Sequence, residues 1–348
     1  MVHIKWQHYP SVALLPVAKA WLVIQSNFGL ASNTIEAYGR ALEDYLQLSA
    51  RLEFPPVSAT REHISTYVRD LTSRQSPLGA NVRAFDSGVG LSNATMQQRL
   101  TAVRLFYDYL IEEGLRGDNP VGRGRYTPGK NFGITRQRGM LPRYRRLPWI
   151  PTDEQWLVIL QAARKEAPRN RLMLALSYDA ALRREELCSL ATNDLDPAYR
   201  LITVRAETTK NRCARVIPYS APTAELYASY LHERRRLSRA RGPLFLSESH
   251  RNRARPISIW TWSKVVQGLA LRSGVSQFTT HTPRHLCLTD LARAEWDIHE
   301  IATFAGHRSA QTTLLYIHLS GQELAAKLQS SMKAVHAWRT QMIAEVLE

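Results

Sequence analysis

The chain has 348 residues, a hydrophobic content of 44% and a formal net charge of +16. This length suits two domains, and the hydrophobic content is that of globular proteins that bury their own cores. The charge predicts a polyanionic partner, for which nucleic acid is the leading class; a basic, solvated surface is the alternative. No apolar run approaches the length of a membrane helix, so we expect no membrane partner.

Cysteine usage and the N-terminus indicate the compartment. The three cysteines, Cys188, Cys213 and Cys287, are odd in number and widely spaced, which argues against a disulfide framework and against a zinc finger. The apolar run 12–17 is short, is broken by Pro16, and has no signal-peptide cleavage pattern after it. We therefore expect reduced thiols in a cytoplasmic protein.

The first half of the chain has the pattern of a helical domain. Asn33 and Glu36 form a capping-box pattern, and apolar residues recur behind them at helical spacing. A second helix is expected over 61–72, and the Gly-, Ser- and Pro-containing stretch 73–90 is expected to be a loop.

A third helix is expected over 94–113, closed by Gly114 as its C-cap. Its polar side carries Arg99 and Arg104, which are candidate DNA contacts.

The densest positive stretch of the chain lies between 116 and 146, where only Asp118 opposes the basic residues. It is interleaved with Gly and Pro, as a linker would be. A solvated linker is one interpretation, and an arm that follows DNA phosphates is the other, which we favour. The candidate DNA contacts in this stretch are Arg123, Arg125, Lys130, Arg136, Arg138, Arg143, Arg145 and Arg146.

A second domain is expected to begin near Pro151, where Thr152 and Gln155 form a further capping box. Two short strands, 201–205 and 213–219, are expected to form a hairpin whose turn carries Lys210. Helices are expected over 170–181, from 183, and over 221–239, 257–273, 283–294 and 298–305.

The segment His281-Thr282-Pro283-Arg284 has the features of an anion pocket at a helix start. Thr282 is a plausible N-cap and Pro283 suits the first helical position. The free N–H groups of a helix N-terminus attract anions, and an imidazole and a guanidinium beside them would strengthen that attraction. Alone, this signal is weak, because a simple cap has the same pattern.

Other candidate residues are equally unspecific when taken singly. Arg183 and Glu186 have the spacing of an ordinary surface ion pair, worth under ~1 kcal/mol. Lys210 resembles any solvated turn lysine, and a tyrosine such as Tyr316, nine positions after His307, is usually a packing residue.

Taken together and in order, these residues resemble the catalytic signature of the tyrosine recombinase (phage integrase) family. The set is Arg183, Lys210, His281, Arg284, His307 and Tyr316. Glu186 and His285 would support it structurally. The first half is also similar to that family, in the entry helix pattern Ser32–Tyr38 and in the segment 99–110 followed by Asn119-Pro120, so the resemblance spans roughly 11–320.

Departures from the family pattern leave the catalytic side chains in place. Ala180-Ala181 stands where a glycine usually precedes the first arginine, and Ala305 replaces a common leucine. Because Arg184 follows Arg183 directly, the register of the first catalytic arginine is open between them, and the family spacing favours Arg183.

The resemblance implies a chemistry that these residue types can perform. Tyr316 would attack the scissile phosphate and form a 3′-phosphotyrosine, with His281 as the base and Lys210 as the acid for the leaving 5′ oxygen. Arg183 and Arg284 would bind the phosphoryl oxygens, to which His281 and His307 would also donate. No metal and no cofactor are expected.

The resemblance also implies a mainly α (α+β) fold and an assembly on DNA. We expect a SAM-like, helical core-binding domain (1–119), a basic linker (120–150), a helical catalytic domain with a small antiparallel sheet (151–320), and an amphipathic helix (321–348). That helix would pack either on its own domain or on a neighbouring protomer. The partners would be double-stranded DNA with specific sites and three further protomers in a tetramer. A second recombinase or an accessory DNA-bending protein would be a further partner. The protein would act in the bacterial nucleoid.

Three functions remain in competition. The first is site-specific recombination through a Holliday junction, for integration, excision or transposition of a mobile element. The second is a type IB topoisomerase-like enzyme, which would relax DNA as a monomer. The third is a non-catalytic DNA-binding accessory protein, against which the complete catalytic set argues.

Overall fold

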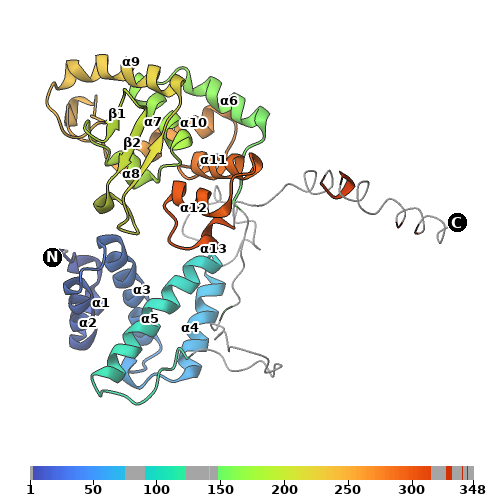
Figure 1. Ribbon diagram of the computed structural model, residues 1–348. Helices are drawn as coiled ribbons and strands as arrows, with labels where there is room; N and C mark the ends of the chain where they lie inside the picture. Colours follow the sequence, from blue (N-terminus) through green and yellow to red (C-terminus); the bar gives the residue numbers. More distant parts are fainter. Residues whose placement is uncertain are drawn as a thin grey trace. The chain divides into compact units, whose positions relative to one another are not determined.

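The computed structural model describes residues 3–74, 91–122, 141, 148–314, 327–330, 339 and 343. The chain divides into two compact units, Met1–Arg145 and Arg146–Glu348, and the boundary falls within the expected linker. The fold is mainly helical with one small antiparallel sheet, which confirms the predicted fold class (Figure 1).

The first unit is helical throughout its described residues. Its elements are η1 (Trp6–His8), α1 (Pro10–Leu14), α2 (Pro16–Asn27), α3 (Ser32–Arg51), η2 (Pro56–Ser58), α4 (Arg61–Ser73) and α5 (Asn93–Glu112). The helices expected over 61–72 and 94–113 are confirmed as α4 and α5, and Gly114 follows α5 with a left-handed φ of +68°.

Two features of the first unit differ from the sequence-based expectation. The prediction of a capping box at Asn33 and Glu36 is wrong, because α3 begins at Ser32 without a side-chain cap. The Glu36 carboxylate pairs instead with Lys5 (3.9 Å) and Arg40 (3.7 Å). The helices α1 and α2 were not predicted, although each has a proline in its first turn, where the missing N–H is not needed.

Aromatic residues dominate the core of the first unit. Trp21, Tyr45, Phe106 and Tyr107 are fully buried and pack in edge-to-face and tilted pairs. The hydroxyls of Tyr45 and Tyr107 share a hydrogen bond of 2.5 Å, so both buried hydroxyls have a partner within this core.

The second unit packs helices against one face of a small sheet. Its helical elements are α6 (Asp153–Ala163), α7 (Pro168–Asp179), α8 (Arg184–Cys188), η3 (Ala206–Thr208), α9 (Ala221–Leu237), η4 (His250–Asn252), α10 (Ile259–Ser273), α11 (Thr282–Arg293), α12 (Ile298–Ala305) and α13 (Ala310–Thr313). The capping box that starts α6 at Thr152 is confirmed. The helices α11 and α12, which carry much of the predicted site, pack against each other (Figure 1).

The sheet has the order β1-β2-β3 and is antiparallel. Strands β2 (Leu201–Val204) and β3 (Arg215–Pro218) are the predicted hairpin, with Val204 opposite Arg215, whereas the two-residue strand β1 (Leu195–Asp196) was missed. Ile202, Val204 and Ile217 are buried, so one face of the sheet packs on the core.

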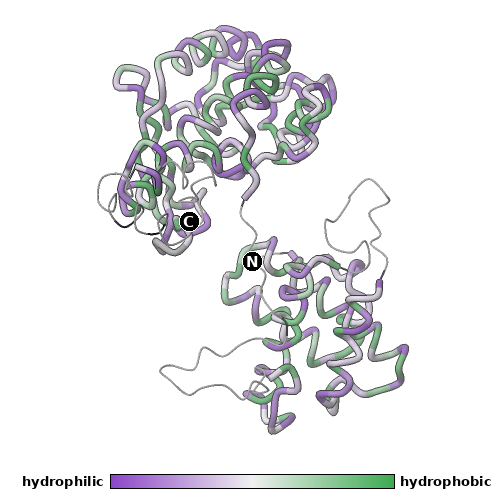
Figure 2. Tube along the Cα trace, turned by 90° about the vertical axis from the view of Figure 1, so that its right-hand side faces the viewer, coloured by the Kyte–Doolittle hydropathy of each residue, from purple (hydrophilic) through white to green (hydrophobic). Residues whose placement is uncertain are grey.

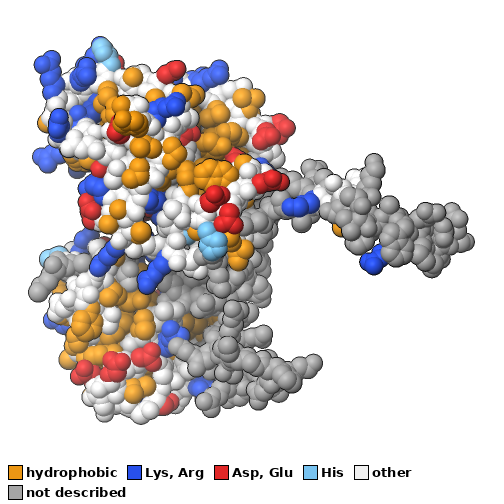
Figure 3. Space-filling view, in the orientation of Figure 1, with side chains coloured by type: hydrophobic (Ala, Val, Ile, Leu, Met, Phe, Trp, Pro, Cys, Tyr) orange, Lys and Arg blue, Asp and Glu red, His pale blue; other side chains and the backbone are white. Residues whose placement is uncertain are grey.

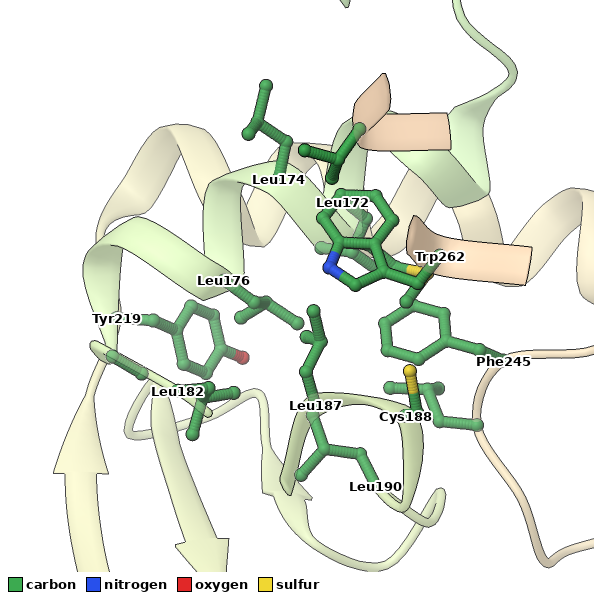
Figure 4. Packing of buried hydrophobic residues seen from close by; sticks show 14 of the residues in the cluster. Leu172, Leu174, Leu176, Leu182, Leu187, Cys188, Leu190, Tyr219, Phe245 and Trp262 are labelled. Carbon is green, nitrogen blue, oxygen red and sulfur yellow. The ribbon is translucent and has the colours of Figure 1, made fainter. Parts of the chain in front are cut away.

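The core of the second unit fixes the short helix α8 that precedes the hairpin. Leu187 is fully buried and lies among leucines and the rings of Phe245 and Trp262 (Figure 4). Figure 2 shows hydrophobic and hydrophilic residues alternating along the helices, as expected for helices with one buried face. In the part of the chain that the structure describes, no helix has the length and apolar character needed to cross a membrane.

Candidate active site

The first predicted arginine stands at the N-cap of α8. The Arg183 N–H donates to Glu186 Oε2 (3.0 Å), and its Nη1 donates to Glu186 Oε1 (2.8 Å). Glu186 is only 1% exposed. The predicted pair is therefore a buried structural link, which sets the direction of the Arg183 side chain.

The structure distinguishes Arg183 from its neighbour. Arg183 Nη1 and Nη2 lie 3.5 and 3.4 Å from the carbonyl oxygens of Ala305 and Gly306, beside the predicted His307. Arg184 instead pairs with Glu185 (2.7 Å) and donates to Ser263 Oγ (3.3 Å). Of the two guanidiniums, Arg183 therefore faces the Gly306–His307 turn.

The start of α11 differs from the expectation by one residue. The predicted N-cap, Thr282, is the first residue of the helix and is 2% exposed, and its Oγ1 accepts the N–H of Thr279 (2.9 Å) rather than capping α11. His281 takes the N-cap position without a side-chain cap bond. Pro283 remains in the first turn, where a proline is tolerated.

Arg284 is buried, with 3% of its surface exposed, and neutral acceptors surround it. Its guanidinium donates to the carbonyl oxygens of Ala181 and Ala305 and to His307 Nε2 (2.9 Å). Ala181 has a left-handed φ of +45°, and this conformation explains why glycine is favoured near this position in the sequence pattern. The backbone bends here so that its carbonyl meets the guanidinium.

The contacts of His307 define its tautomer. A guanidinium has no acceptor atom, so Nε2 must accept from Arg284, and the ring proton must lie on Nδ1. Nδ1 is 2.9 Å from Thr313 Oγ1, which then accepts. Desolvation, followed by the charges of Arg284, Arg183 and Arg215, lowers the pKa of His307 to about 3, so the ring is neutral at physiological pH.

Gly306 makes the turn before His307 possible. It ends α12 with a φ of +63°, and a Cβ at this position would lie 2.8 Å from Arg215 Nη1. Both the backbone conformation and the packing therefore require glycine.

The hairpin places Lys210 beside the same turn. Lys210 is exposed in the β2–β3 connection, and the next residue, Asn211, donates from Nδ2 to the carbonyl of Gly306 (3.0 Å). This bond holds the exposed, lysine-bearing loop at the rim of the cluster.

His281, which precedes α11, and His285 in its first turns both have lowered pKa values. His281 is exposed at the rim, yet partial desolvation lowers its pKa against the opposing effect of Glu185, and the charges of Arg184, Arg284 and Arg183 lower it further. Burial, then the charges of His281 and Arg284, lowers the pKa of His285 to about 4. Both rings are therefore mainly neutral near pH 7.

Sequence reasoning missed three side chains of this cluster. Arg215 Nη2 and Nη1 donate to Glu186 Oε2 (2.7 Å) and Oε1 (3.2 Å), while its Nε donates to the carbonyl of Phe304 (3.1 Å). Thr313, which is fully buried, and Asn211 are the other two. A charged residue at the start of a strand, opposite the buried Val204, was the available signal for Arg215.

Several predicted residues lie outside the described residues. They are the nucleophile Tyr316, almost all of the helix 321–348 and the eight basic linker residues Arg123, Arg125, Lys130, Arg136, Arg138, Arg143, Arg145 and Arg146. Arg99 forms an ion pair with Asp44 (2.5 Å), and Arg104 is partly exposed on α5. Their contact with DNA stays a prediction.

The electrostatics of the cluster favour an anion. Burial alone would raise the pKa of Glu186, but the hydrogen bonds and charge of Arg215 and the bonds from Arg183 outweigh it and lower the pKa to about 2. This carboxylate is shared by two guanidiniums, and Arg284 adds a third positive charge at the Ala305 carbonyl, which Arg183 also contacts. In the described parts of the chain, His, Cys, Asp and Glu residues do not gather in groups of three that could hold a metal.

The surface of the second unit carries further positive charge. Figure 3 shows Lys and Arg side chains at the corner where α9 ends. The exposed arginines at this end of α9 and just after it are Arg235, Arg236, Arg239 and Arg241. This surface has the charge expected of a protein that contacts a polyanion.

Comparisons with known proteins agree with this geometry. The model of the phage integrase family matches residues 151–323. A tyrosine recombinase XerD from Oceanobacillus iheyensis is 27% identical over 309 residues, covering 87% of this chain and 93% of that protein. A XerD from Caulobacter vibrioides is 29% identical, covering 86% and 90%.

Among solved structures, the Tn1549 transposon integrase in complex with transposon right end DNA matches with a TM-score of 0.63. The two chains are 16% identical, and the match covers 92% of this chain and 99% of that one, so it supports the fold. From its motifs, its fold and these relatives, the chain belongs to the tyrosine recombinase (phage integrase) family, whose enzymes are site-specific DNA recombinases.

Proposed function

We propose that this chain cuts and rejoins DNA at specific sites through a 3′-phosphotyrosine formed by Tyr316. The observation that carries the proposal is the convergence of Arg183, Arg284 and His307 around the carbonyls of Ala305 and Gly306. Two permanent positive charges there match the negative charge of a phosphodiester, which increases during attack.

The proposed reaction assigns each proton and bond. The Tyr316 oxygen bonds to phosphorus as the bond to the 5′ oxygen breaks. Because its pKa is lowered, neutral His281 can accept the tyrosine proton, and the exposed Lys210 donates a proton to the leaving oxygen. Covalent attachment keeps the strand ready for religation.

For His307 we propose a part other than donation to the phosphate. Its Nε2 lies 2.9 Å from Arg284 Nη2, and as an acceptor from that guanidinium it would orient Arg284. We propose that it holds Arg284 in place for the phosphoryl oxygens, and that Glu186 and His285 support the site from behind.

We also propose the assembly and biological role that accompany this chemistry. Four protomers would exchange strands in pairs through a Holliday junction on two DNA sites, with the helix 321–348 packing on its own domain or on a neighbour. The match to an integrase bound to transposon end DNA supports integration, excision or transposition of a mobile element. A second recombinase or a DNA-bending protein would be a further partner, and the bacterial nucleoid the place of action.

A suicide substrate tests the chemistry directly. DNA from the flanks of the gene, nicked close to the cleavage position, should trap wild-type protein as a covalent adduct that survives denaturation. Tyr316→Phe should bind the same DNA and form no adduct, because it lacks the nucleophilic oxygen.

Two outcomes would contradict the proposal. Absence of a wild-type adduct on every flanking fragment would exclude the cleavage reaction, and an adduct with Tyr316→Phe would mean that another residue attacks. Relaxation of a plasmid lacking such sites, without recombination between two sites, would instead favour a monomeric topoisomerase-like enzyme.

A further inference from the structure

We propose that Arg215 is a positioning residue for DNA cleavage: it neutralises Glu186, leaving Arg183 available to the scissile phosphate, and it ties the Gly306–His307 turn to the sheet. This inference rests on the proposed function, because it assigns a role within the same site. It concerns a side chain that acts through other residues and does not itself bind DNA.

Two guanidiniums, those of Arg183 and Arg215, share the Glu186 carboxylate. Glu186 is 1% exposed, and Arg215, whose side chain is 7% exposed, binds both of its oxygens. Arg183 reaches the carboxylate with a single guanidinium nitrogen, Nη1. Arg215 therefore supplies the principal counter-charge, and Arg183 Nη2 lies instead toward the carbonyl of Gly306, at 3.4 Å.

The consequence of losing Arg215 follows from the cost of a buried charge. A buried carboxylate without sufficient counter-charge is strongly unfavourable. Arg183 would become its principal partner and would turn toward it with both ends of its guanidinium, since this bidentate arrangement is the strongest available. The arginine would then be withdrawn from the phosphate.

Arg215 also links β3 to α12. Arg215 Nε donates to the carbonyl of Phe304 in the last turn of α12 (3.1 Å), and its side chain fills the space that a Cβ at Gly306 would occupy. Arg284 and Arg183 both contact the carbonyl of Ala305 in the same turn. A single side chain thus connects the sheet, the carboxylate and the turn.

The test compares Arg215→Met with Arg205→Met in the full-length protein. Arg205 also lies at the hairpin, but it pairs with Asp194 (3.0 Å) and Glu207 (2.9 Å) and donates to the carbonyl of Ser189. We expect Arg215→Met to slow single-turnover cleavage of the suicide substrate on the order of 10²-fold, as loss of an electrostatic element of a site does. DNA affinity should change by less than about threefold, and Arg205→Met should cleave at the wild-type rate.

A second substitution separates positioning from general structural support. Glu186→Gln removes the charge but keeps a residue that can complete the capping box of α8. If Arg215 acts by neutralising Glu186, Arg215→Met combined with Glu186→Gln should cleave at least about tenfold faster than Arg215→Met alone. Lowering the pH, which protonates Glu186 once Arg215 is absent, should also reduce the defect of Arg215→Met, but not that of the double variant.

The outcomes are distinct. If wild type forms no adduct, the proposed function fails. If wild type reacts and Arg215→Met equals Arg205→Met, or if the double variant is as slow as Arg215→Met at every pH, the role of Arg215 is refuted. Should Arg215→Met not fold by circular dichroism, Arg215→Lys replaces it, and failure of Glu186→Gln to speed cleavage by Arg215→Lys refutes the inference equally.

Discussion

Two clusters of arginines, one in each unit, differ in what holds them. In the first unit, Asp70 binds Arg51 (2.6 Å), Asp44 binds Arg99 (2.5 Å), and Arg74 pairs with both carboxylates. The Tyr67 hydroxyl also donates to Asp44 (2.8 Å). In this cluster carboxylates form ion pairs with the arginines, and these ion pairs connect α3, α4 and α5.

In the second unit, Glu186 is shared by Arg183 and Arg215, while backbone carbonyls and a neutral imidazole hold Arg284. Carbonyl oxygens fix the position of a guanidinium without cancelling its charge, so the charge remains available to an anion. The comparison teaches that the kind of acceptor, more than the presence of arginines, separates a stabilising cluster from an anion-binding site.

The largest effect should come from Arg284→Met. Removing this guanidinium removes charge stabilisation at the phosphate, and we expect cleavage of the suicide substrate to fall by about 10²–10³-fold. The rate of adduct formation at saturating DNA measures it. A variant that folds and cleaves within about fivefold of wild type would break the distinction between the two clusters.

A smaller effect is expected for Thr313→Val, which keeps the shape of the side chain but removes the acceptor of the His307 Nδ1 proton. The loss of one neutral hydrogen bond is worth about 1 kcal/mol, so cleavage should slow by roughly five- to tenfold. Nitrogen NMR of the imidazole should show Nδ1-protonated His307 in wild type and a tautomer mixture in the variant. An Nε2-protonated ring in wild type would contradict the assigned geometry.

The matched substitution in the first unit, Arg74→Met, should act on stability rather than on chemistry. Arg74 is half-buried and pairs with Asp44 and Asp70, so its loss should lower the free energy of unfolding by about 1–2 kcal/mol. Urea denaturation measures this. Single-turnover cleavage at saturating DNA should stay at the wild-type rate, and a large cleavage defect in the folded variant would erase the contrast between the clusters.

The last effect concerns pH and the stability of the second unit. The pKa values of His285, about 4, and His307, about 3, lie below the ordinary histidine value. The unfolded chain therefore takes up protons near pH 6.5 while the folded chain does not, and stability should fall as the pH drops from about 6.5 to about 4. His285→Asn should flatten this dependence, whereas an unchanged slope would place His285 in a more solvated setting.

Local sequence patterns predicted the elements whose signals are local. The capping box at Thr152, the periodicity of α5 and the glycine after α12 all concern residues within a few positions of one another, and the structure has them as predicted. The helix α1 was missed because part of its support is distant: Glu43 accepts the backbone N–H groups of Ser11 (3.1 Å) and Val12 (3.0 Å).

The candidate site shows the same division. Arg183, Arg284 and His307 were unspecific when taken singly and became recognisable only through their order and spacing along the chain, which resemble the family signature. Arg215 was predicted only as one residue of the strand expected over 213–219, since its partner Glu186 lies 29 residues away. Thr313 could not be predicted as the acceptor of the His307 Nδ1 proton, because that role depends on the orientation of the His307 ring. No spacing in the sequence reveals this orientation.

The measurement that tests the central claim most directly uses a suicide substrate whose scissile phosphate is replaced by an uncharged methylphosphonate. If Arg284 stabilises the negative charge of that phosphate, Arg284→Met should cleave the phosphate substrate about 10²–10³-fold more slowly than wild type. On the methylphosphonate substrate the rate should fall by less than about tenfold. Equal losses on both substrates would contradict the account, because they would show that Arg284 supports the fold of the site rather than the charge of the substrate.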